Sequence, residues 1–93
     1  MPIRSFKHKG LEQFFVADTK AGIQAAHAPK LKRLLARLNV SAKPEDMNLP
    51  GFGFHPLKGR STGRFSVSVN GNWRLTFEFE GSDAVVVDYE DYH

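Results

Sequence analysis

The sequence contains no cysteine, which excludes disulfide bonds and metal sites built from thiolates. It has no apolar run near the roughly 20 residues that cross a membrane as a helix, and it contains no internal repeat or low-complexity tract. Close to the N-terminus, Lys7, His8 and Lys9 interrupt any apolar segment, so this region does not resemble a signal peptide. We therefore expect a cytoplasmic protein that does not enter a membrane.

The rest of the composition is that of an ordinary small globular protein. A chain of 93 residues predicts a single domain, residues 1–93, with a modest core. The formal net charge is +3 and the pI is about 9.5, which favours a polyanionic partner without identifying one. The distribution of charge says more, because basic residues dominate as far as Arg74 and acidic residues crowd the chain after it.

The N-terminal half predicts a short strand and two helices. Residues 3–6 are a candidate strand, and residues 9–17 carry apolar side chains at helical spacing. A second amphipathic helix, from Ala25 or Pro29 to Leu38, has a stripe of leucines on one side. Its basic residues form either a solvated surface or a surface that lies on nucleic acid. These residues are Lys30, Lys32, Arg33 and Arg37.

Two runs of alternating apolar and polar residues, 65–69 and 73–79, predict adjacent strands that each bury one face. A two-residue Asn-Gly turn between them would place apolar residues opposite polar ones in every pair. A three-residue turn, 70–72, places Val69 opposite Trp73 and keeps the two faces separate. The alternation therefore predicts the register as well as the strands.

The same register predicts the pairs on the polar face of this hairpin. Ser68 is expected opposite Arg74, and Arg64 opposite Glu78 as a pair of opposite charges.

A second turn, at residues 80–83, predicts a further antiparallel strand with Val85 and Val87 on the core face. Counting back from this turn brings Glu90 level with Arg74. The end of the chain is therefore expected beside this arginine.

On the other side of the hairpin, residues 54–58 are expected to fold back and bring His55 within a residue or two of Ser68. Pro56 cannot donate to a strand ladder, so this segment is an edge or a broken strand. The order of strand, two helices and three or four antiparallel strands predicts an α+β domain, with the helices on one face of the sheet. The other face then carries one row of polar groups: His55, Arg74, Asp91, Tyr92 and His93.

Taken singly, the members of this row have structural explanations, such as a histidine bonded to backbone or an arginine in an ion pair. Taken together they suit the cleavage of RNA. RNA supplies its own nucleophile, the 2′-hydroxyl, and needs a base, an acid and positive charge from the protein. A metal site is a poor explanation because only His55 and His93 offer nitrogen ligands, and no cofactor is expected. The serines lack the elbow motif of a nucleophilic serine.

Four separated stretches, residues 5–11, 55–59, 72–74 with 76–77, and 89–93, resemble the HigB toxins of the RelE-like superfamily of bacterial toxin–antitoxin systems. The resemblance implies a RelE-like fold and a ribosome-dependent mRNA endonuclease that works in the decoding site. It also implies neutralisation by HigA, a helix-turn-helix antitoxin, and contact with operator DNA only through that antitoxin.

By motif position, the resemblance implies an active-site set that adds Lys58 to the row. The set is His55, Lys58, Arg74, Asp91, Tyr92 and His93. Arg74 would carry charge for the phosphate, Lys58 and His93 would transfer protons or stabilise charge, and the general base is not identified. Asp91 and Tyr92 would position the substrate. Asn72 is a candidate for contacting a base. Arg60 stands where many relatives have an acid, and it is a candidate for contacting the RNA. The alternative is a non-catalytic module of the same fold that binds RNA or protein.

Overall fold

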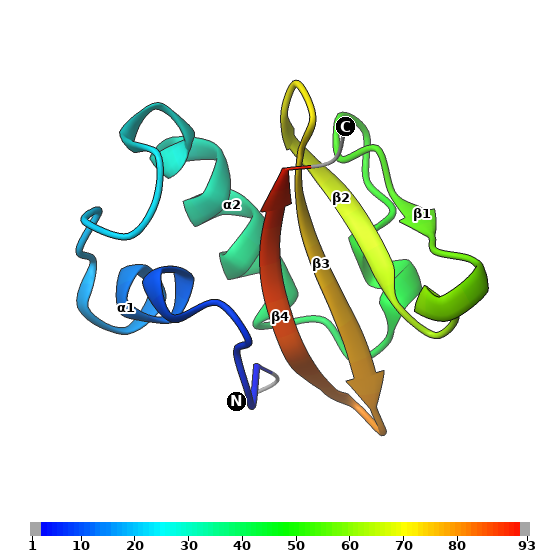
Figure 1. Cartoon of the computed structure of the whole chain (residues 1–93). Helices are drawn as coiled ribbons and strands as arrows, with labels where there is room; N and C mark the ends of the chain where they lie inside the picture. Colours follow the sequence, from blue (N-terminus) through cyan, green and yellow to red (C-terminus); the bar gives the residue numbers. More distant parts are fainter. Residues whose placement is uncertain (1–2, 92–93) are drawn as a thin grey trace.

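The computed structural model describes residues 3–91. It confirms an α+β fold, in which two helices lie on one side of a four-stranded antiparallel sheet (Figure 1). The strands follow the order β1-β2-β3-β4. The elements are α1 (Lys9–Ala17), α2 (Ala28–Leu38), β1 (His55–Pro56), β2 (Phe65–Asn70), β3 (Trp73–Glu80) and β4 (Asp83–Asp91), with 3-10 turns at Ala25–His27, Pro44–Met47 and Gly59–Ser61. No helix in the described range is long and apolar enough to cross a membrane.

The core lies between the helices and one face of the sheet. The leucine stripe of α2 is fully buried, together with Leu11 and Phe14 of α1. These side chains form one cluster with the apolar residues of the sheet, including Leu75 and Phe77 of β3. Helix α2 begins with Pro29 in its first turn, where the missing N–H breaks no helical hydrogen bond. The opposite face of the sheet is therefore left without a helical layer.

The expected N-terminal strand is reduced to two isolated bridges. Ile3 and Phe6 pair in parallel with Ala84 and Val87 of β4, and the Arg4 N–H donates to the Ala84 carbonyl at 2.8 Å. The segment therefore covers the outer edge of β4, which would otherwise offer unpaired backbone groups to another strand.

The register of the β2–β3 hairpin matches the prediction along most of its length. Ser68 faces Arg74, and the predicted pairs between residues 65–67 and 75–77 also form. At the tip, however, Asn70 rather than Val69 faces Trp73, because the register shifts between residues 68 and 70. This bulge permits a two-residue turn, with Gly71 at a φ of 56°, without exchanging the two faces.

Strand β4 contains a second bulge that the alternation did not predict. Next to the turn, Ala84 faces Phe79 and Val85 faces Glu78, so Val85 does not share the core face as expected. The register then shifts at Val86, a non-glycine residue with a φ of 51°. Beyond the bulge, the predicted alignment of Glu90 with Arg74 is confirmed.

An aromatic cluster joins the start of α2 to the end of the sheet that carries Arg74. The Nδ1 atom of His27 and the hydroxyl of Tyr89 share a hydrogen bond of 2.5 Å, and both side chains are 4% exposed. The ring of Trp73 stacks on that of Tyr89 with centroids 4.5 Å apart. Because Trp73 precedes Arg74 and Tyr89 precedes Glu90, the cluster holds the backbone of both polar residues in place.

We predict that Tyr89→Phe lowers the free energy of unfolding by about 1 to 3 kcal/mol, because it leaves a buried ring nitrogen of His27 without its partner. The double variant His27→Leu/Tyr89→Phe should lose less than the sum of the two single changes. Urea unfolding followed by tryptophan fluorescence measures all four proteins. Additive losses would contradict a coupled pair.

Tyr89 should also make the stability of the fold depend on pH. Burial raises the pKa of Tyr89 above its ordinary value of 10.0, so the folded state holds the phenol proton more tightly than the unfolded chain. The contribution of this protonated phenol to the free energy of unfolding is complete below pH 10. It is lost as the pH rises through the pKa that Tyr89 has in the folded state. Wild type should therefore lose stability above pH 10 more steeply than Tyr89→Phe, and identical slopes in alkaline urea titrations would contradict this.

Candidate active site on the open face of the sheet

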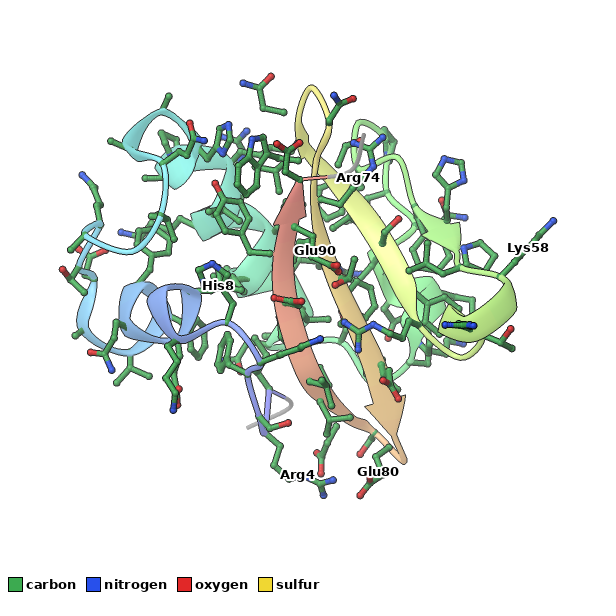
Figure 2. All side chains as sticks on the ribbon, viewed as in Figure 1. Arg4, His8, Lys58, Arg74, Glu80 and Glu90 are labelled. Atoms are coloured by element: carbon green, nitrogen blue, oxygen red, sulfur yellow. The ribbon has the colours of Figure 1, made fainter. Side chains whose placement is uncertain are left out.

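Arg74 lies near the start of β3, on the face of the sheet opposite the helices. Its side chain is half-buried, and its Nη1 atom donates to the carbonyl of Gly71 at 3.0 Å and to that of Trp73 at 3.3 Å. The guanidinium is thus held at the hairpin tip, outside the core (Figure 2). In residues 3–91 it forms no ion pair. The alternative that Arg74 serves only as a structural ion-pair partner is therefore not supported.

His55 shares this face with Arg74. It pairs with Ser66 of β2, and the next pair along the open face joins Ser68 to Arg74. The segment before His55 is fastened to the same strand, because the Ser68 N–H donates to the Phe52 carbonyl at 2.7 Å. His55 lies within two residues of Ser68, as predicted, but it is level with Ser66 and Thr76, so the prediction of one row with Arg74 is wrong. Its imidazole is exposed to solvent.

Lys58 and Arg60 lie further out, in the connection between β1 and β2. Lys58 precedes the 3-10 turn Gly59–Ser61, is exposed, and extends away from the sheet, apart from Arg74 (Figure 2). Arg60 is also exposed. The structure therefore brings His55 and Arg74 to one face and leaves these two cations at its margin.

The chain end approaches Arg74 as far as the structure describes it. Asp91 is exposed and pairs with Trp73, the neighbour of Arg74. Because Asp91 pairs with Trp73 and alternates with Glu90 along β4, it lies on the side of Tyr89, and the prediction that it joins the row on the open face is wrong. Tyr92 and His93 lie outside the described residues, so their roles stay predictions. Asn72 is exposed in the turn between β2 and β3, close in sequence to Arg74.

The basic residues of α2 lie on the other side of the sheet and divide into two groups. Lys30 donates to the carbonyl of Gly51 at 3.0 Å, and the Nε atom of Arg37 donates to that of Asp46 at 3.0 Å. Both therefore hold down the irregular connection after α2. Lys32 and Arg33 are exposed, so for these two residues both interpretations, a solvated surface and a surface that lies on nucleic acid, stay open.

A hydrogen-bonded network next to Arg74 was missed as part of the site. Arg64 donates to Glu78 at 2.9 Å and to the Thr76 hydroxyl at 2.8 Å, and that hydroxyl donates to Glu90 at 2.7 Å. The pairing of Arg64 with Glu78 had been predicted from the register. The bonds of Thr76 with Arg64 and Glu90 had not been predicted. They could have been found from the alternation, which places Thr76 and Glu90 on the same face of the sheet.

Within the part of the chain that the structure describes, no three histidine or acidic side chains gather as metal ligands. Two surface hollows of about 320 and 360 Å³ run along α1 and α2 and include Phe14, Asp18 and Lys32 in their walls. Their walls come from the helical side of the protein, and none of the site residues predicted on the sheet lines them.

Comparison with known proteins identifies the family. The family model described as "RelE-like toxin of type II toxin-antitoxin system HigB" matches residues 4–93. The chain is also 37% identical over 91 residues to the Endoribonuclease HigB of Proteus vulgaris, an alignment that covers 98% of this chain and 99% of that protein. The protein therefore belongs to the HigB-like toxins, the RelE-like toxins of type II toxin–antitoxin systems.

Proposed function

We propose that this protein is an endoribonuclease that cuts mRNA on the ribosome, with the open face of the sheet as its active site. The observation that carries the proposal is the position of Arg74, which lies outside the core on a face that also bears His55. The name of the Proteus vulgaris relative, Endoribonuclease HigB, supports the endoribonuclease activity. An open face suits a polymer substrate, because an extended RNA strand needs no enclosing pocket.

Arg74 is the residue proposed to bind the phosphate group of the RNA. Its guanidinium stays charged and offers two parallel N–H groups to phosphate oxygens. In the reaction, the 2′-hydroxyl attacks the adjacent phosphorus, and the charge that grows on the phosphate oxygens is stabilised by Arg74. His55, Lys58 and His93 are the proposed carriers of protons or charge. Asp91 and Tyr92 are the proposed positioning groups.

The loose arrangement of these groups supports the proposed dependence on the ribosome. His55 and Lys58 are exposed, and Arg74 is bonded back to the carbonyl of Gly71. A free RNA would therefore have to order itself and these side chains at once. A ribosome that already holds the message in a fixed geometry removes most of that entropic cost.

Membership of a toxin–antitoxin family implies an antitoxin partner. We propose a HigA-type helix-turn-helix antitoxin that neutralises the nuclease and carries the contact with operator DNA. A gene for a small helix-turn-helix protein directly beside the toxin gene would support this partner. The competing proposal is a non-catalytic module whose open face binds RNA or protein through the same cations.

We predict that Arg74→Ala lowers the rate of mRNA cleavage on ribosomes by about a hundredfold to a thousandfold, because it removes the charge that stabilises the transition state. Mapping of new 5′ ends after brief expression measures cleavage. Arg4→Ala is the matched control, since Arg4 is paired with Glu80 and Asp83 at the opposite end of the sheet. Growth arrest by wild type and Arg74→Ala alike, without new 5′ ends, would favour the non-catalytic module.

We predict that Lys32→Ala/Arg33→Ala weakens binding to ribosomes in a salt-dependent manner without loss of fold. Each of these exposed cations that lies near phosphate releases counterions on binding, so the slope of log affinity against log salt should fall by roughly 1.5. Titration of labelled protein with ribosomes at several salt concentrations measures the slope. Lys7→Ala/Lys9→Ala removes the same charge elsewhere, and an equal effect in both variants would show that only net charge matters.

A further inference from the structure

The bulge in β4 decides which acidic side chain stands beside Arg74. Next to the turn, β4 pairs Ala84 with Phe79 and Val85 with Glu78. If that register continued, Tyr89 would face Arg74, and Glu90 would point toward the helices. The extra residue at Val86 shifts the register, so Glu90 faces Arg74 instead. The bulge thus turns Glu90 onto the open face.

The bulge is held in an unfavourable conformation by two side chains. Val86 has a φ of 51°, which is a strained value for a β-branched residue. Its N–H donates to the Ser5 hydroxyl at 2.8 Å, and its carbonyl accepts from Arg64 at 3.0 Å. Such strain persists only where the surroundings enforce it, and it gathers at functional sites.

Arg64 also controls the donor that orients Glu90. A guanidinium can only donate, so the Thr76 oxygen must accept the 2.8 Å bond from Arg64. The single hydroxyl hydrogen of Thr76 is then free to point at the Oε2 atom of Glu90, 2.7 Å away. Thr76 is fully buried and Arg64 is also bonded to Glu78, so neither group can turn freely. The Glu90 carboxylate is therefore held at a defined angle.

Arg74 and Glu90 are neighbours that do not neutralise each other. They are cross-strand partners with the usual separation of about 5 Å between such Cβ atoms. Within residues 3–91, no ion pair joins them, because Glu90 is bonded to Thr76 and Arg74 to the hairpin tip. Glu90 lies between β3 and β4, below Arg74 (Figure 2). The two residues thus stand side by side in the sheet, with the guanidinium bonded toward the hairpin tip and the carboxylate bonded toward Thr76.

We propose that Glu90 is a catalytic residue that takes the proton from the attacking 2′-hydroxyl, with Thr76 and Arg64 as its positioning residues. This rests on the proposed nuclease function. The 2′-oxygen forms a bond to phosphorus as its proton passes to the Glu90 carboxylate. The bond from phosphorus to the 5′-oxygen breaks, and that oxygen takes a proton from water or from an ammonium group such as that of Lys58. The product is a 2′,3′-cyclic phosphate.

The first experiment compares wild type, Glu90→Gln and Glu80→Gln in single-turnover cleavage of a defined mRNA on programmed ribosomes. Glutamine keeps the shape of the side chain and can still accept from Thr76, but it cannot serve as a base. The rate should fall about a hundredfold or more, while the affinity for the ribosomes stays within about twofold because the change removes only transition-state chemistry. Glu80→Gln, at the exposed far end of β3, should cut as wild type does.

A second substrate separates a base from an acid. An mRNA with a 5′-bridging sulfur at the cut site has a leaving group that departs without protonation. Loss of a general acid is rescued on this substrate, whereas loss of a general base is not. Glu90→Gln should stay slow on both substrates. Full rescue by sulfur, or an unchanged rate on the normal message, would overturn the assignment of Glu90 as the base.

The positioning role is tested at Thr76, which also keeps the proposal falsifiable if Glu90→Gln folds poorly. Thr76→Val keeps the shape and removes the hydroxyl, and the rate should fall about tenfold, the effect of one lost hydrogen bond. Thr76→Ser restores the hydroxyl and should return the rate to near that of wild type, with both melting temperatures recorded. Equal rates for the two variants would overturn this role. A wild type that leaves the programmed message uncut would instead refute the nuclease function itself.

Discussion

Leu75 and Phe77 of β3 are fully buried beneath the leucine stripe of α2, and this contact determines which side of the sheet every other residue faces. Because side chains alternate along a strand, burying these two residues forces Arg74, Thr76 and Glu78 onto the opposite face. The packing that stabilises the fold and the groups proposed for catalysis are therefore separated by the thickness of one sheet. The aromatic cluster of His27 and Tyr89 extends the same packing to the end of the sheet where the candidate site lies.

That constraint is also why much of the fold was readable from the sequence. The need to keep Val67 opposite Leu75 and Ser68 opposite Arg74 admits only one register, and the structure has it. The helical spacing of leucines located α2 in the same way. The predicted alignment of Glu90 with Arg74 was correct, but the register predicted next to the turn was wrong, because Val85 faces Glu78. The bulge at Val86 shifts the register by one residue and so restores the predicted alignment.

The bulge itself could not be predicted, because its causes lie far away in the chain. The polar groups of Val86 are bound by Ser5 and Arg64, and nothing in a run of valines indicates that one of them adopts a left-handed conformation. The same limit applies to the charges on α2. Lys30 and Arg37 look alike in sequence to Lys32 and Arg33, yet their contacts with an irregular connection remove them from the free surface. The local sequence pattern predicts which face of an element is buried and how strands pair. Whether a charged side chain is free or bonded depends on residues far away in the chain.

The separation of the two faces also accounts for where strain is found and for where, within residues 3–91, Arg74 and Glu90 stand without forming an ion pair. A left-handed valine on the core side would disturb the packing of Phe77 and its neighbours, whereas on the open face its cost is offset by bonds from Arg64 and Ser5. Those bonds leave Arg74 and Glu90 adjacent and of opposite sign without joining them. A protein selected only for stability has no reason to maintain this arrangement, because a regular β4 would avoid the strain. The departure from regular alternation is therefore informative, and it occurs in the strand that places an acidic side chain beside the proposed phosphate ligand.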